Sequence, residues 1–84
     1  MAERLGLTLR QRRERCGLSQ EAVADQAQIS RQHLQLLEAG LGNRRTRAPA
    51  NPTIGTLLAL SRVLDVPIGE LVVEIFAGHE PDDD

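Results

Sequence analysis

The chain has 84 residues, enough for one domain with a modest core, and its single cysteine, Cys16, excludes an internal disulfide and suits the cytoplasm. One aromatic residue and two histidines argue against base-stacking and zinc sites, and no apolar run predicts a membrane span or a signal peptide. The net charge is −2, but residues 1–62 hold ten arginines against five acidic residues, whereas residues 63–84 hold seven acidic residues and no arginine. A basic body of this kind favours an anionic partner.

Five helices and no strand are predicted. The first helix covers about residues 5–16 and stops at Gly17, because glycine readily adopts the left-handed conformation at helix ends. Its inner face carries four residues at helical spacing: Leu5, Leu9, Arg13 and Cys16.

The second and third helices form a closely joined pair. Ser19 is the expected cap of the second helix, about residues 20–26, and Ser30 is the expected cap of the third, residues 31–39. The small side chain of Ala24 faces inward, as a close helix crossing requires. Two short helices joined by so few residues are typical of a helix-turn-helix.

The fourth helix begins after Thr53, its expected N-cap, and the fifth covers about residues 68–77. Residues 41–52 lack periodicity and are expected to form an extended basic loop. The helix-turn-helix domain therefore spans residues 1–77, and a mobile acidic tail follows at residues 78–84. Two further core faces are predicted: Ile54, Leu57, Leu60 and Leu64 on the fourth helix, and Ile68, Leu71, Val72 and Ile75 on the fifth.

Three stretches resemble the Xre, or lambda-repressor-like (Cro-type), helix-turn-helix DNA-binding family. They are LRQRRERCGLSQ, GLSQEAVADQAQISRQHLQLLEAG and NPTIGTLLALSRVLDVPIGEL, and together they cover nearly residues 4–72. The resemblance implies an all-α, compact bundle of about five helices around the helix-turn-helix. The chain departs from the family pattern twice, at Gln28, where the family usually has a glycine in the turn, and in a longer loop after the third helix.

In the family that the chain resembles, the third helix lies in the major groove and its outward side reads bases. Arginine donates two hydrogen bonds to guanine, glutamine pairs with adenine, and leucine packs on the thymine methyl. Leu36 is expected to be exposed for this purpose, although it could instead lie at the edge of the next helix or loop. The predicted base-reading residues are Arg31, Gln32, Gln35 and Leu36.

Phosphate contacts are predicted around this helix. The resemblance assigns one contact to Gln20, at the positive end of the second helix. His33 is expected to pack or to contact a phosphate, and not to bind a metal. The loop arginines would contact phosphates or enter the minor groove, with a solvated loop as the alternative. The other predicted phosphate-binding residues are Arg44, Arg45, Arg47 and Asn51.

Arg13 lies on the inner stripe of the first helix, where an unpaired charge would be costly. The resemblance implies that it pairs with Glu38 on the third helix, and the alternative is two separate surface charges. Such a pair would hold the first helix against the third without necessarily adding net stability.

The function predicted is that of a sequence-specific double-stranded DNA-binding regulator, a homodimeric repressor on a palindromic operator. Val73 and Phe76 are predicted to lie at the dimer interface, with simple core packing as the alternative. No nucleophile lies beside a base and no glycine loop binds phosphate, so neither an enzyme nor a cofactor is expected. Two alternatives remain open: an antitoxin that binds a toxin and represses its own operon, and a restriction-modification controller or phage switch protein.

Overall fold

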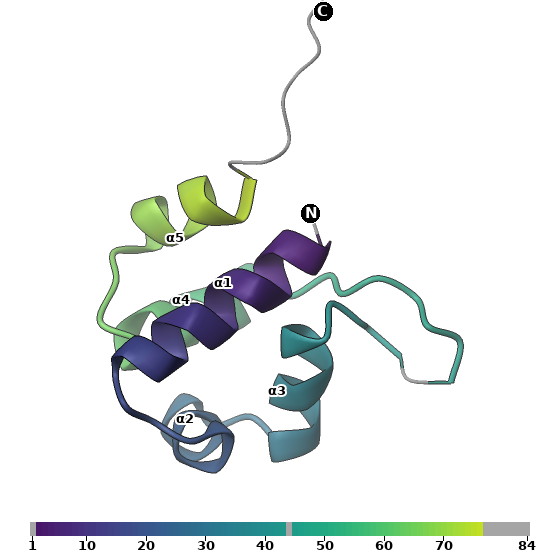
Figure 1. Ribbon diagram of the computed structural model, residues 1–84, viewed down its shortest axis with the longest axis horizontal. Coiled ribbons are helices and arrows are strands. Elements are labelled where there is room, and N and C mark those ends of the chain that lie inside the picture. Colours follow the sequence, from purple (N-terminus) through teal and green to yellow (C-terminus); the bar gives the residue numbers. More distant parts are fainter. Residues whose placement is uncertain (1, 44, 77–84) are drawn as a thin grey trace, which may run out of the picture.

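A computed structural model describes residues 2–43 and 45–76. In Figure 1, α1 crosses the middle of the molecule, α2 and α3 lie together on one side of it, and α5 lies on the other. Helix α1 contacts α3 and α5, whereas α4 contacts α2 and α5. The predicted acidic tail lies outside the described residues. The described helices are α1 (Ala2–Arg15), α2 (Gln20–Ala27), α3 (Arg31–Glu38), α4 (Ile54–Val63) and α5 (Ile68–Phe76).

The three predicted N-caps begin their helices as expected. The side-chain oxygens of Ser19, Ser30 and Thr53 each accept a hydrogen bond from the backbone amide three residues later, at 2.9 to 3.1 Å. Each cap satisfies an amide that has no partner within the helix. These local bonds fix where α2, α3 and α4 start. Because each bond joins residues only three positions apart, the starts of the helices could be predicted from the sequence.

The core lies among the five helices, and each of them contributes buried side chains. Its fully buried large side chains are Leu5, Leu9, Val23, Leu34, Leu60 and Leu71. Two predicted core positions are wrong. Cys16 is exposed because α1 ends one residue earlier, and its Sγ donates to the carbonyl oxygen of Leu64 at 3.4 Å. Ile54 is 68% exposed because it is the first residue of α4 and lies at the edge of the core.

The sequence predicts that the loop after α3 is extended and buries no residue in the core, and this prediction is wrong. Leu41 and Pro49 form an antiparallel bridge, and the amide of Gly42 donates to the carbonyl oxygen of Ala48 at 2.7 Å. Ala50 is buried, with 1% of its surface exposed. The loop is therefore a short hairpin whose second arm is anchored in the core. None of the helices in the described part of the chain is long and apolar enough to cross a membrane.

Candidate nucleic-acid interface

The turn between α2 and α3 depends on Gln28. This residue has φ 60° and ψ 41°, the left-handed conformation that the family usually assigns to glycine, and its amide donates to the carbonyls of Ala24 and Asp25. A glutamine in this conformation carries strain on the order of 1 kcal/mol. Val23 of α2 and Leu34 of α3 are both buried in the core. Helix α3 therefore packs one side against the core and presents its other side to solvent.

The outward side of α3 carries the predicted base-reading residues. Arg31, Gln32 and His33 are exposed in its first turn, whereas Gln35 and Leu36 are half-buried. The expectation that Leu36 is exposed is wrong, because it is half-buried. The chain turns back at this end of α3, and the Leu41 amide donates to the Leu36 carbonyl oxygen at 2.8 Å. The most accessible side chains thus lie at the N-terminal end of α3.

A polar network joins the three helices around this surface. Arg13 donates to both carboxylate oxygens of Glu38, from Nε at 2.7 Å and from Nη2 at 3.1 Å, and Nη1 donates to the Leu18 carbonyl at 3.0 Å. Only 5% of the Glu38 side chain and 14% of the Arg13 side chain are exposed. The hydrogen bonds to Glu38 raise the pKa of the Arg13 guanidinium. Gln20 completes the network, because its Nε2 donates to Glu38 Oε1 at 2.9 Å.

Helices α1 and α3 pack closely at Gly6, a contact that the sequence interpretation missed. A Cβ atom at this position would lie 2.4 Å from the carbonyl oxygen of Glu38 and 2.9 Å from that of Leu37. Both are backbone atoms, so the two helices could not keep this separation with any larger residue. Gly6 and the Arg13–Glu38 pair together hold α1 against the C-terminal end of α3.

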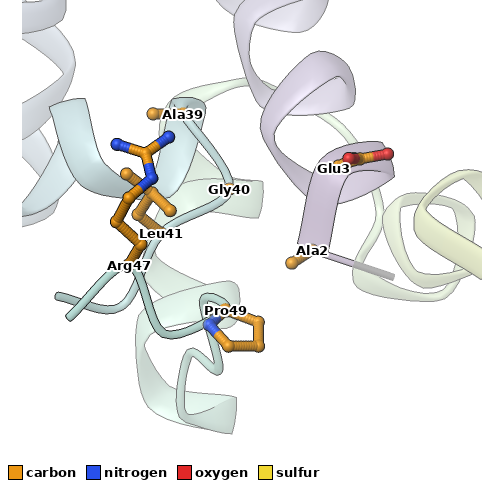
Figure 2. A pocket seen from close by; sticks show the side chains of 7 residues that line it. All are labelled: Ala2, Glu3, Ala39, Gly40, Leu41, Arg47 and Pro49. Atoms are coloured by element: carbon orange, nitrogen blue, oxygen red, sulfur yellow. The ribbon is translucent and has the colours of Figure 1, made fainter. Parts of the chain in front are cut away.

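The hairpin after α3 places exposed arginines beside this surface. Arg45 and Arg47 are both exposed, as is Asn51 just before α4, whereas Arg44 lies outside the described residues. Figure 2 shows Arg47 at a cavity of about 470 Å³ between the start of α1, the end of α3 and Pro49. In the described part of the chain, no group of three or more histidine, cysteine or acidic side chains could hold a metal ion.

The sequence matches the model of a helix-turn-helix domain family over residues 4–74. The chain belongs to this helix-turn-helix family. It is therefore a DNA-binding transcription regulator and not an enzyme. No curated protein matches the sequence.

Two crystal structures of the clp gene regulator ClgR from Corynebacterium glutamicum resemble the whole bundle, each with a TM-score of 0.73. The first is 22% identical and covers 92% of this chain and 73% of that chain. The second is 20% identical and covers 96% and 95%. This likeness confirms the predicted all-α bundle of five helices that contains a helix-turn-helix.

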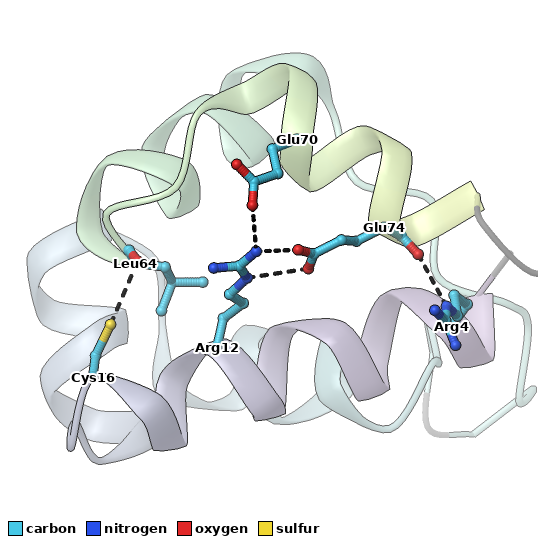
Figure 3. Close-up of polar contacts among 6 residues, drawn as sticks. All are labelled: Arg4, Arg12, Cys16, Leu64, Glu70 and Glu74. Atoms are coloured by element: carbon cyan, nitrogen blue, oxygen red, sulfur yellow. Dashed lines mark hydrogen bonds and ion pairs between the residues drawn. The ribbon is translucent and has the colours of Figure 1, made fainter.

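The helix-turn-helix domain also has ion pairs between α1 and α5 (Figure 3). Helix α5 lies on the other side of α1 from α3 (Figure 1). Arg12 donates to both carboxylate oxygens of Glu74 and, from Nη2 at 2.9 Å, to Glu70. Arg4 Nε donates to the Glu74 carbonyl oxygen at 2.9 Å. The hydrogen bonds from Arg12 lower the pKa of Glu74, and the same bonds raise the pKa of Arg12.

The contribution of Glu74 to stability is expected to depend on pH. Because folding lowers its pKa, the stabilisation is fully present above the ordinary glutamate pKa, about 4.3, and is lost as the pH falls through the lowered value. Thermal unfolding of the protein and of Glu74→Gln, measured from pH 3 to pH 7, checks this. The stability advantage of the unsubstituted protein should be constant above about pH 5 and shrink toward pH 3. An equal difference at both ends of the range would contradict it.

An apolar groove lies between α4 and α5. It has a volume of about 250 Å³, and its walls include Leu57, Val72 and Ile75. Two side chains at its rim are strongly exposed, Ile54 at 68% and Phe76 at 47%. Ile54, which was wrongly predicted to lie in the core, thus belongs to a surface that also includes the end of α5.

Proposed function

We propose that the protein is a homodimeric repressor that reads a palindromic operator with α3, acting on DNA in the cytoplasm. The observation that carries this proposal is the exposed first turn of α3. Among the described residues, the side chains of Arg31 and Gln32 make no intramolecular hydrogen bond, although both are rich in donors. Leu34 and Leu37 bury the opposite side of the same helix, so its orientation is fixed.

The proposed base contacts follow from side-chain chemistry. In the major groove, arginine donates to O6 and N7 of guanine, and glutamine pairs with N6 and N7 of adenine. Arg31 and Gln32 suit these roles, with Gln35 beside them. The half-buried Leu36 keeps part of its surface for a thymine methyl, and its buried part would hold the side chain in place.

Substitution of Gln32 by alanine is expected to weaken the free energy of binding to the operator by about 1–3 kcal/mol and to relax base preference at one position per half-site. Fluorescence anisotropy with duplexes varied at each position measures both effects. Arg31→Ala should do the same at a different position. Arg62→Ala removes the same charge from an exposed site on α4 and is the matched control. If the two arginine variants weakened binding equally and without change of preference, direct reading by α3 would be excluded.

Phosphate contacts are proposed around α3 to fix its register on the duplex. Gln20 lies at the N-terminus of α2, and Glu38 occupies only one of its two amide protons, which leaves the other for a phosphate oxygen. His33, in the first turn of α3, and Asn51, just before α4, are both exposed. Arg44 remains a proposed phosphate ligand on the sequence pattern alone.

A second copy of the chain is the proposed occupant of the α4–α5 groove. A single α3 reads few base pairs, and a two-fold dimer spans two half-sites. Phe76, Val73 and Ile54 project beside the groove, so the same surface offers both projections and a hollow, as a two-fold interface requires. Residues 77–84 hold no large apolar side chain that could fill the groove.

Phe76→Ser is expected to shift the protein from dimer to monomer at micromolar concentration, because it removes a large apolar side chain that projects from the proposed contact surface. Leu7→Ser is the matched control, since Leu7 is also an exposed apolar residue, at 39%, but lies on α1. Sedimentation velocity gives the oligomeric state, and circular dichroism checks that both variants are folded. A monomeric unsubstituted protein, or equal dissociation of both variants, would argue against this interface.

A further inference from the structure

The described parts of the hairpin between α3 and α4, residues 41–43 and 45–49, are held together by hydrogen bonds within the hairpin. Beyond the Leu41–Pro49 bridge, its two arms are so close that a Cβ atom on Gly42 would lie 2.8 Å from the Pro49 carbonyl oxygen. The amide of Ala50 donates to the Gly40 carbonyl oxygen at 3.0 Å and ties the base of the hairpin to the end of α3. The arms are thus placed before any DNA is bound.

The far end of the hairpin is closed by Asn43. Its Oδ1 accepts hydrogen bonds from the amides of Arg45 and Thr46, at 2.8 and 3.0 Å, and its carbonyl oxygen accepts one from the amide of Arg47 at 2.8 Å. These backbone amides are used internally, so they are not free to bind phosphate. Among the described residues of the turn, the exposed side chains of Arg45 and Arg47 are available to a ligand.

The two arginines occupy different places. Arg47 lies next to the end of α3, and in Figure 2 its guanidinium reaches toward Ala39 at the wall of the cavity. Arg45 lies in the turn, four residues from Leu41 along the first arm and four from Pro49 along the second. Figure 1 shows this turn projecting beyond α3, away from the helical bundle.

We propose that Arg45 enters the minor groove that flanks the α3 half-site, whereas Arg47 contacts the phosphate backbone between the two grooves. This inference rests on the proposed major-groove docking of α3. Arg47 lies beside the end of α3, and Arg45 lies farther out, in the turn that projects beyond it. The phosphate backbone separates the major groove from the minor groove, which is about 6 Å wide, so the arginine farther from α3 is the one placed to cross it.

The chemistry of the minor groove favours a single arginine there. A groove so narrow admits one extended side chain but not a two-stranded hairpin, which would rest on the backbone. A·T-rich segments have an especially narrow minor groove with an enhanced negative potential, which attracts arginine. The hairpin would therefore add a preference for A·T pairs outside the bases that α3 contacts.

Base analogues in the flanking pairs test this. All duplexes share the half-site selected by α3, and the flanking pairs are A·T, G·C, inosine·C or 2,6-diaminopurine·T. Inosine·C lacks the minor-groove amino group of guanine, whereas diaminopurine·T carries one. We expect the protein to bind the A·T and inosine·C duplexes alike, and about fivefold or more tighter than the other two. An equal affinity for all four, or one that follows the major-groove pattern, would overturn the inference.

Two variants separate the arginines. Arg45→Ala should abolish the flanking preference, and Arg47→Ala should keep it while weakening all four complexes equally and flattening the salt dependence by about 0.9 per lost phosphate contact. A flanking preference that survives in Arg45→Ala would also overturn the inference. If the unsubstituted protein showed no preference for the half-site over unrelated duplex DNA, the proposed function would be overturned, and this inference with it.

Discussion

Glu38→Ala is expected to lower the free energy of unfolding by about 3 kcal/mol, the scale of breaking one side of a buried ion pair. The substitution leaves the Arg13 guanidinium, which is largely buried on α1, without its carboxylate, and Gln20 loses the same partner. The cost therefore comes from an uncompensated charge and not from a lost surface contact. Urea denaturation followed by circular dichroism measures it.

Two further variants identify the cause. Asp25→Ala removes an exposed carboxylate from α2 and should change the stability by less than about 0.5 kcal/mol. Replacing both partners, Arg13→Met with Glu38→Leu, should recover most of the loss, because apolar residues of similar size can replace a buried pair at little cost. An unchanged melting temperature for Glu38→Ala would mean that the pair does not hold the two helices.

The second large effect is expected at Gly6, where alanine should destabilise the protein by about 3 kcal/mol. In an isolated helix alanine is favoured over glycine by about 1 kcal/mol. Helix propensity alone would therefore make Gly6→Ala stabilising, and a loss of stability would point to the contact with α3. The new methyl group would meet backbone atoms of α3, with Glu38 O at 2.4 Å and Glu38 C at 2.8 Å. These atoms cannot rotate away as a side chain could, so α1 must move from α3 and the packing around Leu5 and Leu37 must change.

Gly69→Ala is the matched control for this prediction. Gly69 lies in the first turn of α5, and a Cβ atom there would meet nothing within 4 Å. This variant should be as stable as the unsubstituted protein or more stable, by up to about 1 kcal/mol. Thermal unfolding of the two variants side by side gives the comparison. If Gly6→Ala were as stable as Gly69→Ala, the close crossing of α1 and α3 would be excluded.

The helices could be predicted from the sequence because their signals are local. Ser19, Ser30 and Thr53 bond to amides three residues away, and the inward leucines follow the helical period. The left-handed conformation of Gln28 could also be predicted, because the family that the chain resembles usually has a glycine there. The glutamine itself does not indicate this conformation.

The contacts between helices could not be predicted in the same way. Gly6 resembles any other glycine in a helix until the position of α3 is known. Arg12 and Glu74 are separated by 62 residues, and only the spacing of the arginines on α1 and of the glutamates on α5 hints at a pairing. The hairpin after α3 was missed because its stabilising bonds join backbone atoms across the loop, between Gly42 and Ala48.

Selection of binding sites from random duplex DNA tests the central claim most directly, that a dimer reads bases through the exposed first turn of α3. The unsubstituted protein should enrich a palindrome whose half-sites lie about one helical turn apart. The Gln32→Ala variant should enrich the same palindrome with one position per half-site relaxed. Enrichment of no motif, or of a motif that Gln32→Ala leaves unchanged at every position, would contradict the claim.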